Sequence, residues 1–266
     1  MLRPCSAAPS KTPALVSRLR DWQAAAVQRR LADLIRFYAI LDRLEARAGG
    51  RRLLSGCTGR MQWPQRGVYF FMEEGEHQTD TGEGLRVVRV GTHALTATSQ
   101  TTLWKRLSQH RGQAAGGGNH RGSIFRLLVG STLLPGDGSC PTWGLGNNAP
   151  REVRQREAPL EQEVSQIIGA MPFLWLEIDD PPGGESLRGV IERNSIALLS
   201  NFKSDTALDA ASPAWRGRRC VQCKSAGADN EKVRRSGLWN QRHVDEDYDP
   251  AFLDTFERLV DGNAAP

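Results

Sequence analysis

Two short runs of β-forming residues, with a polar loop between them, constrain this fold more than any other feature of the chain. The first run is Gly67–Met72 (GVYFFM) and the second is Leu85–Gly91 (LRVVRVG). The loop between them holds Gly75, Gly82 and Gly84. β-Branched and aromatic residues on either side of such a loop are typical of two paired strands. The pattern therefore predicts a long β-hairpin.

Helical and extended patterns alternate after the hairpin. Helices are predicted where apolar residues recur at three- and four-residue steps, and a strand where β-forming residues run together. This order is typical of an α+β domain, here predicted over residues 66–202, with a small three-stranded antiparallel sheet flanked by helices. The predicted elements are helices at 101–110, 157–168 and 185–199, a strand at 173–178, a segment at 123–129 that fits a helix or a strand, and an irregular stretch at 131–156.

Two segments of different character flank this domain. Residues 1–65 comprise a loose tail and an amphipathic stretch, 15–48, that predicts one or two basic helices ending at Gly49-Gly50. Residues 203–266 predict an irregular C-terminal extension, apart from a final amphipathic helix at 252–260.

Positive charge is concentrated in the N-terminal flank. Residues 1–66 hold 13 Lys and Arg against 4 Asp and Glu, whereas the whole chain has a net charge of +5. Arginine forks match the geometry of phosphate, so this charge favours a polyanionic partner such as a nucleic acid. The alternatives are a solvated helix face and a surface that binds another protein.

Composition excludes several classes of protein. The sequence has no run of about 18 or more apolar residues, so we expect no membrane span. Its first twenty residues lack the apolar core of a secretory signal. Five cysteines, an odd number, are typical of reduced thiols. We therefore expect a cytoplasmic protein, whose oligomeric state the sequence does not predict.

The hairpin and two helices carry residues that resemble the GIY-YIG nucleases, a family that includes homing endonucleases, some restriction enzymes and the incision subunit of bacterial nucleotide-excision repair. The two signature strands of the family are matched by Gly67–Tyr69 and Arg89–Gly91. Its helical arginine and glutamate are matched by Arg106 and Glu192. The resemblance implies a divalent-metal-dependent endonuclease that hydrolyses phosphodiester bonds in DNA.

The resemblance implies a role for each of these residues. Glu192 would bind Mg²⁺ or Mn²⁺, since one carboxylate suffices for a hard cation that keeps most of its waters. Arg106 would hold the scissile phosphate, and Tyr69 would accept the proton of the attacking water with help from nearby positive charge. His110 lies one helical turn after Arg106 and would take part in proton transfer. The N-terminal arginines would add salt-dependent contacts to the DNA backbone.

One position departs from the family pattern. Arg89 stands where the second signature strand carries a tyrosine, and an arginine stays protonated and cannot act as a base. Arg89 is retained as a catalytic candidate because it can bind phosphate. The change favours an alternative function, a nucleic-acid-binding protein with little or no catalysis. For the asparagine that the family places after the glutamate helix, Asn201 is the nearest candidate, at a short spacing.

Each candidate also has an ordinary structural interpretation. Tyr69 stands beside two phenylalanines and suits a hydrophobic core. Glu192 is flanked by arginines and suits a surface ion pair. Arg106 suits a solvated helix surface, and His110 suits a cation at the C-terminal end of a helix dipole.

A glycine-rich loop at 116–119 matches no phosphate-binding or dinucleotide-binding motif. If the loop lies near DNA, His120 and Arg121 would touch its phosphates, so Arg121 joins Arg106 as a predicted nucleic-acid contact. Cys220 and Cys223 have a metal-type spacing, but a zinc site needs two more ligands, and free thiols are the default interpretation.

Two tryptophans stand beside arginines in the C-terminal extension. Trp215 precedes the run Arg216–Arg219, and Trp239 follows Val233–Arg235. Arginine next to an aromatic ring can grip a nucleic-acid strand, but tryptophans in an irregular segment more often anchor it to the core, and we favour anchoring.

Overall fold

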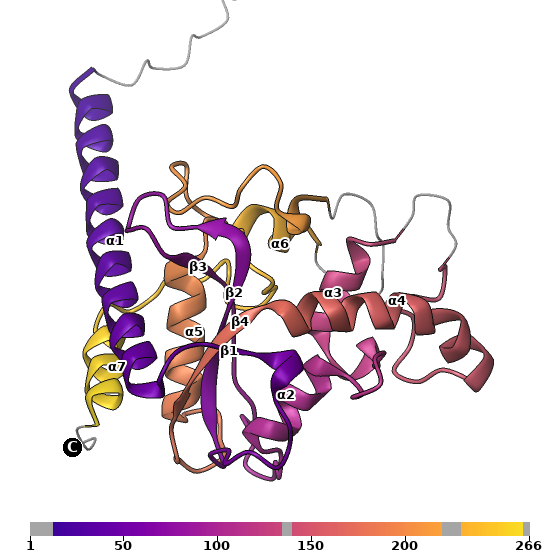
Figure 1. Cartoon of the computed structure of the whole chain (residues 1–266). Coiled ribbons are helices and arrows are strands. Elements are labelled where there is room, and N and C mark those ends of the chain that lie inside the picture. The colour runs from indigo at the N-terminus through magenta and orange to yellow at the C-terminus, as the bar shows by residue number, and fades with distance from the viewer. Residues whose placement is uncertain (1–12, 135–139, 220–229, 263–266) are drawn as a thin grey trace, which may run out of the picture.

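The computed structural model describes residues 13–134, 140–219 and 230–262. A central antiparallel sheet is covered by helices on both faces (Figure 1). The helices are α1 (Pro13–Ala48), α2 (Leu103–Arg111), α3 (Ile124–Ser131), α4 (Arg151–Ala170), α5 (Leu187–Leu199), α6 (Asn230–Ser236) and α7 (Phe252–Asp261), with short 3-10 turns η1 (Leu54–Gly56), η2 (His120–Gly122) and η3 (Arg216–Arg219).

The sheet has four strands where the sequence predicts three. Strands β2 (Gly67–His77) and β3 (Leu85–Gly91) form the predicted hairpin, and β4 (Pro172–Glu177) pairs with the other edge of β2. The additional strand, β1 (Arg52–Leu53), pairs with β4 and gives the order β1-β4-β2-β3. Two residues are too few to produce an alternating pattern, so the sequence carries no signal for β1. The α+β class is confirmed.

Alternation along β2 divides the interior into two cores. Val68, Phe70 and Met72 face a core shared with α1, α5 and α7. Tyr69 and Phe71 face the opposite core, shared with α2, α3 and α4. Because successive side chains of a strand point to opposite faces, one aromatic run supplies both cores.

Two helical predictions change in the structure. The ambiguous segment 123–129 is the helix α3, which begins where the Ser123 hydroxyl accepts a hydrogen bond from the amide of Arg126. Helix α4 begins at Arg151 rather than at 157, so the predicted irregular stretch is too long. The first turns of α4 are entirely polar apart from Val153, and apolar periodicity does not mark such a start.

The basic stretch 15–48 lies within the single helix α1, which packs against α7 on one side of the molecule (Figure 1). Four ion pairs join the two helices, two made by Arg36 and two by Arg43. Arg30 donates to the carbonyls of Leu198 and Ser200 at the end of α5. These three arginines are therefore used in packing the chain, in contrast to their predicted contacts with DNA.

At Trp215 and Trp239 the C-terminal segment packs onto the β2–β3 hairpin. The amide of Trp239 donates to the carbonyl of Val88 at 2.7 Å. The indoles of Trp215 and Trp239 are buried, and both donate to one carboxylate oxygen of Glu73 at 3.0 Å. The tryptophans therefore anchor the segment, as favoured from the sequence. Cys220 and Cys223 lie outside the described residues.

None of the helices in the described ranges combines the length and apolar character that crossing a bilayer requires.

Candidate active site

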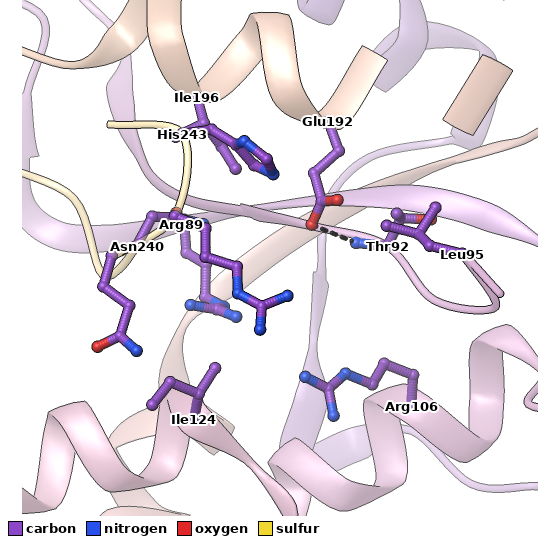
Figure 2. Close-up of a pocket in the computed structure, with 11 residues that line it drawn as sticks. Arg89, Thr92, Leu95, Arg106, Ile124, Glu192, Ile196, Asn240 and His243 are labelled. Carbon is purple, nitrogen blue, oxygen red and sulfur yellow. Dashed lines mark hydrogen bonds between the residues drawn. The ribbon is translucent and has the colours of Figure 1, made fainter. Parts of the chain in front are cut away.

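A pocket of about 380 Å³ opens at the end of β3. Helix α5 supplies Glu192 and helix α2 supplies Arg106, and the two side chains point toward the same space from opposite sides (Figure 2). Arg89 enters from β3. The structure thus brings together three of the five predicted catalytic residues. The remaining lining is Thr92, Leu95, Ile124, Ile196, Asn240, Gln241, Arg242 and His243.

Glu192 is oriented by the backbone of the strand end. One carboxylate oxygen accepts a hydrogen bond from the amide of Thr92 at 3.0 Å (Figure 2). Burial raises the pKa of Glu192, against the lowering effect of the Thr92 amide and of the positive charge on Arg89. The flanking arginines do not form an ion pair with Glu192, because Arg188 pairs with Asp180 and Arg193 with Glu246. The surface ion-pair interpretation of Glu192 is therefore wrong.

Arg106 is held by neutral groups. Its Nη1 donates to the side-chain oxygen of Gln109 at 2.9 Å and to the carbonyl of Gly122 at 3.3 Å. In the described part of the chain its guanidinium makes no ion pair. A half-buried cation that keeps its charge uncompensated beside a pocket is suited to bind an anionic group.

Arg89 is buried and held more tightly than Arg106. It donates to the carbonyl of Trp239, and its guanidinium lies 4.7 Å from the centre of the Phe125 ring. Burial lowers the pKa of Arg89, an effect that Tyr69 and Glu192 oppose. Its Nε has no hydrogen-bond partner within the described residues. The side chain therefore adds positive charge to the wall of the pocket.

Tyr69 and His110 form a buried pair behind this wall. The Tyr69 hydroxyl lies 2.7 Å from Nε2 of His110, and Nδ1 of that histidine lies 2.7 Å from the Ser123 hydroxyl. Burial lowers the pKa of His110 well below its ordinary value, and the charges of Arg106 and Arg89 act in the same direction. His110 is therefore neutral near pH 7. Neither Tyr69 nor His110 lines the pocket, so they lie next to it and not in it.

The two signature glycines are required by close packing. A side chain at Gly67 would collide with the carbonyl of Leu176 on β4. A side chain at Gly91 would collide with the Tyr69 hydroxyl, which lies directly against the backbone of β3. The Gly91 position therefore links the second signature strand to the tyrosine of the first.

A family model described as a GIY-YIG domain matches residues 28–266. The chain belongs to the GIY-YIG family. Comparison with curated proteins gives no match, and comparison with solved structures gives none either. Membership places the chain in a family of nucleases, whose substrates are nucleic acids.

The GIY-YIG match includes the C-terminal segment, and this segment supplies pocket residues that the sequence analysis missed. Asn240 holds β3 from the side, donating to the Val90 carbonyl at 2.9 Å and accepting from its amide at 3.2 Å. Asn201, the predicted asparagine, instead binds Arg30 and Leu208. No local pattern marks Asn240, because its place depends on pairing with a strand 150 residues earlier.

His243 is the second missed residue. It lines the pocket with a positive φ of 63°, in the left-handed region that non-glycine residues seldom adopt. Its Nδ1 lies 2.9 Å from a carboxylate oxygen of Glu246. A histidine held by a carboxylate adds a further ionisable group to the GIY-YIG pocket, beside Glu192 and Arg106.

Arg121 is not brought to the pocket. Its guanidinium forms a two-pronged ion pair with Glu157 of α4, at 2.6 and 2.8 Å, and both side chains are buried. His120 is buried as well and bonds Glu161 through its backbone amide and Nδ1. The predicted phosphate contacts of His120 and Arg121 are therefore corrected, since both side chains fix the glycine-rich loop to α4.

Among the residues that the structure describes, Glu192 is the only carboxylate that lines the GIY-YIG pocket. Across the described ranges, His, Cys, Asp and Glu side chains do not gather in threes as a multi-ligand metal site requires. A single carboxylate, with one oxygen on the Thr92 amide and the other in the pocket, fits a hard cation that takes its remaining ligands from water and phosphate.

Proposed function

We propose that this GIY-YIG protein is a divalent-metal-dependent endonuclease that hydrolyses phosphodiester bonds in DNA. The observation that carries the proposal is the arrangement of Glu192 and Arg106 on opposite sides of one pocket, with the Tyr69–His110 pair behind it. Phosphodiester hydrolysis needs a bound phosphate, charge stabilisation and a proton acceptor for water. Arg106 and Glu192 supply the first two from the pocket, and the Tyr69–His110 pair supplies the third from next to it.

Arg106 binds the scissile phosphate and Glu192 holds the cation. A guanidinium offers two parallel donors to a phosphate, and Arg106 has no carboxylate partner to displace among the described residues. When bound at Glu192, Mg²⁺ or Mn²⁺ supplies positive charge for the phosphate oxygens. Arg89, in the wall of the pocket, adds to the positive electrostatic field around the phosphate.

Tyr69 and His110 move the proton. The phenol oxygen accepts a proton from the attacking water while its own proton passes to Nε2 of His110, 2.7 Å away. In the free protein burial, together with the charges of Arg106 and Arg89, disfavours the positive charge that His110 gains with this proton. A phosphate bound at Arg106 offsets the positive charge of the arginines. Substrate binding therefore raises the proton affinity of His110, which accepts the proton of Tyr69.

Two observations favour a second candidate, a nucleic-acid-binding protein with little catalysis. Arg89 occupies the position of a signature tyrosine, and the Tyr69 hydroxyl is buried. In that case the pocket binds phosphate without activating water.

Supercoiled-plasmid cleavage by the wild type and Glu192→Gln, with Mg²⁺, with Mn²⁺ and with chelator, separates the two. The nuclease proposal expects metal-dependent nicking that Glu192→Gln loses by about 10³-fold or more, with DNA binding in chelator retained. Glu185→Gln, at an exposed carboxylate just before α5, is the matched control and should cleave normally. Tight binding by a wild type that cuts no plasmid or genomic DNA would support the binding protein instead.

A further inference from the structure

A second and larger cavity, of about 880 Å³, adjoins the active site. It lies between the end of α2, the glycine-rich loop 112–119 and α4, and is called here the α4 groove. Arg106 connects the two cavities, because its Nη1 bonds Gln109 and the carbonyl of Gly122, and both of these residues line the groove. The groove therefore begins within hydrogen-bond distance of Arg106.

Helix α4 compensates its buried acidic side chains and leaves two arginines of its first turn exposed. Glu157 and Glu161 are buried in ion pairs with Arg121 at 2.6 Å and Arg126 at 2.5 Å. Arg151 and Arg154 stand one turn apart, line the groove and are exposed. The buried acidic residues are therefore neutralised by the scaffold, and the groove keeps the positive charge of the two arginines.

In the described part of the chain, several side chains that line the groove have hydrogen-bonding groups without a partner. Within residues 13–134, 140–219 and 230–262, neither Arg151 nor Arg154 forms an ion pair, and the amides of Gln155 and Gln162 make no hydrogen bond. Of the described carboxylates, Glu161 alone lines the groove, and Arg126 and His120 already compensate it. A cavity with free guanidinium and amide groups suits a polyanion with polar edges.

The opposite rim of the groove is backbone. Gly116 and Gly117 have φ values of 89° and 81°, in the region that favours glycine. A side chain at either position would meet only the Gln162 side chain, at 3.7 and 3.8 Å. The Gly117 carbonyl also accepts a hydrogen bond from the Ser165 hydroxyl of α4 at 2.9 Å, so the loop closes this end of the groove against α4 with a rim of backbone.

We propose that the α4 groove binds the DNA strand that flanks the scissile phosphate, with Arg151 and Arg154 contacting its backbone phosphates. The glutamine amides then face the base edges. This inference rests on the proposed function, since it takes Arg106 as the site of the scissile phosphate. It assigns to α4 the contacts with the DNA backbone that the sequence analysis predicted for the N-terminal arginines.

The test compares Arg154→Gln with Arg156→Gln. The two arginines are exposed and two residues apart on α4, so they point to different faces, and only Arg154 lines the groove. Binding of a fluorescein-labelled, mixed-sequence DNA duplex is measured by anisotropy in chelator over a range of salt concentrations. Arg154→Gln should lower the slope of log affinity against log salt by about 1, and Arg151→Gln/Arg154→Gln by about 2.

Arg156→Gln should leave that slope unchanged. Equal slopes for Arg154→Gln and Arg156→Gln, lowered or not, would overturn the groove proposal, as would a wild type that does not bind the duplex at low salt. Cleavage assays keep the two proposals apart. With an active wild type, the groove variants should raise KM and leave kcat unchanged, whereas an inactive wild type contradicts the nuclease proposal and leaves the salt slopes to decide on the groove.

Discussion

The active-site pocket and the α4 groove lie side by side and are built in opposite ways. In the pocket, Arg89 and Arg106 are held by backbone carbonyls and a glutamine, and Glu192 is held by a backbone amide. In the groove, Arg151 and Arg154 are exposed and have no ion-pair partner in the described structure. Fixed charges suit a transition state, whose geometry is strict, whereas mobile charges suit a flexible backbone of varied sequence. Under the two proposals, the pocket determines the rate of cleavage and the groove contributes affinity for DNA.

The largest expected effect concerns the scaffold that both regions share. Burial raises the pKa of Glu161, but hydrogen bonds from His120 and the charge of Arg126 outweigh it and hold the pKa below its ordinary value. Glu161→Gln leaves Arg126 as a buried cation without its partner, so we expect a loss of about 3–5 kcal/mol in the free energy of unfolding, measured in urea. Glu163→Gln, exposed on the same helix, should cost less than about 0.5 kcal/mol. A small effect at Glu161 would mean that this carboxylate belongs to the groove and not to the scaffold.

Arg106→Gln tests the pocket directly. Loss of a fixed cation at the scissile phosphate should lower kcat by about 10²–10³-fold, with a smaller change in DNA affinity. Lys105→Gln, at the exposed neighbouring position, serves as the control in the same plasmid-cleavage assay. If Arg106→Gln weakened binding as much as it slowed cleavage, the division between a catalytic pocket and a binding groove would fail.

Tyr69→Phe should have the next largest effect. It removes the hydroxyl that bonds His110 at 2.7 Å and leaves the ring in the core. We expect kcat to fall by about 10²-fold and binding in chelator to be unchanged. Normal cleavage by Tyr69→Phe would show that water reaches a different base, for which His243 is the pocket candidate.

Lowering the pH should lower the free energy of unfolding through a histidine next to the pocket, whereas the arginines of the groove keep their charge. Burial lowers the pKa of His93, next to the pocket residue Thr92, to about 4. Between pH 6.5 and 4 the unfolded chain takes up a proton at this histidine and the folded chain does not, so stability falls as the pH falls. Urea unfolding should show a decrease over this interval that is about 1–2 kcal/mol smaller in His93→Gln, since His110 still contributes in both proteins. Parallel pH profiles would show that His93 does not contribute.

Local pattern was sufficient for most elements of the fold. The hairpin, the helices around Arg106 and Glu192, and strand β4 all follow from periodicity and from caps such as Thr102, whose hydroxyl accepts from the amide of Lys105. Strand β1 and the polar start of α4 were not predictable, because neither depends on a periodic apolar face. The position of β1 is set by its pairing with β4, far away in the sequence.

The residues of the candidate site that lie in elements with a local sequence pattern could be predicted. Tyr69, Arg106, His110 and Glu192 each stand at a recognisable place on a strand or helix. The prediction that Arg121 contacts phosphate was wrong. Its local sequence resembles that of a phosphate-binding arginine, but Arg121 forms an ion pair with Glu157, which lies 36 residues later in the chain. Asn240 and His243 were missed for the converse reason, since their position depends on how the last segment docks on β3.

The docking of the C-terminal segment also sets the point during synthesis at which the pocket is completed. A ribosome delivers the chain from its N-terminus, so both signature strands, Arg106 and Glu192 are made before Asn240 and His243. Until Trp239 reaches its place beside Val88, the pocket has one wall missing and Arg89 lacks the carbonyl that holds it. A nascent or shortened chain therefore carries Arg89, Arg106 and Glu192 without a complete pocket. The pocket is complete only after the segment that holds Trp239, Asn240 and His243 has docked on β3.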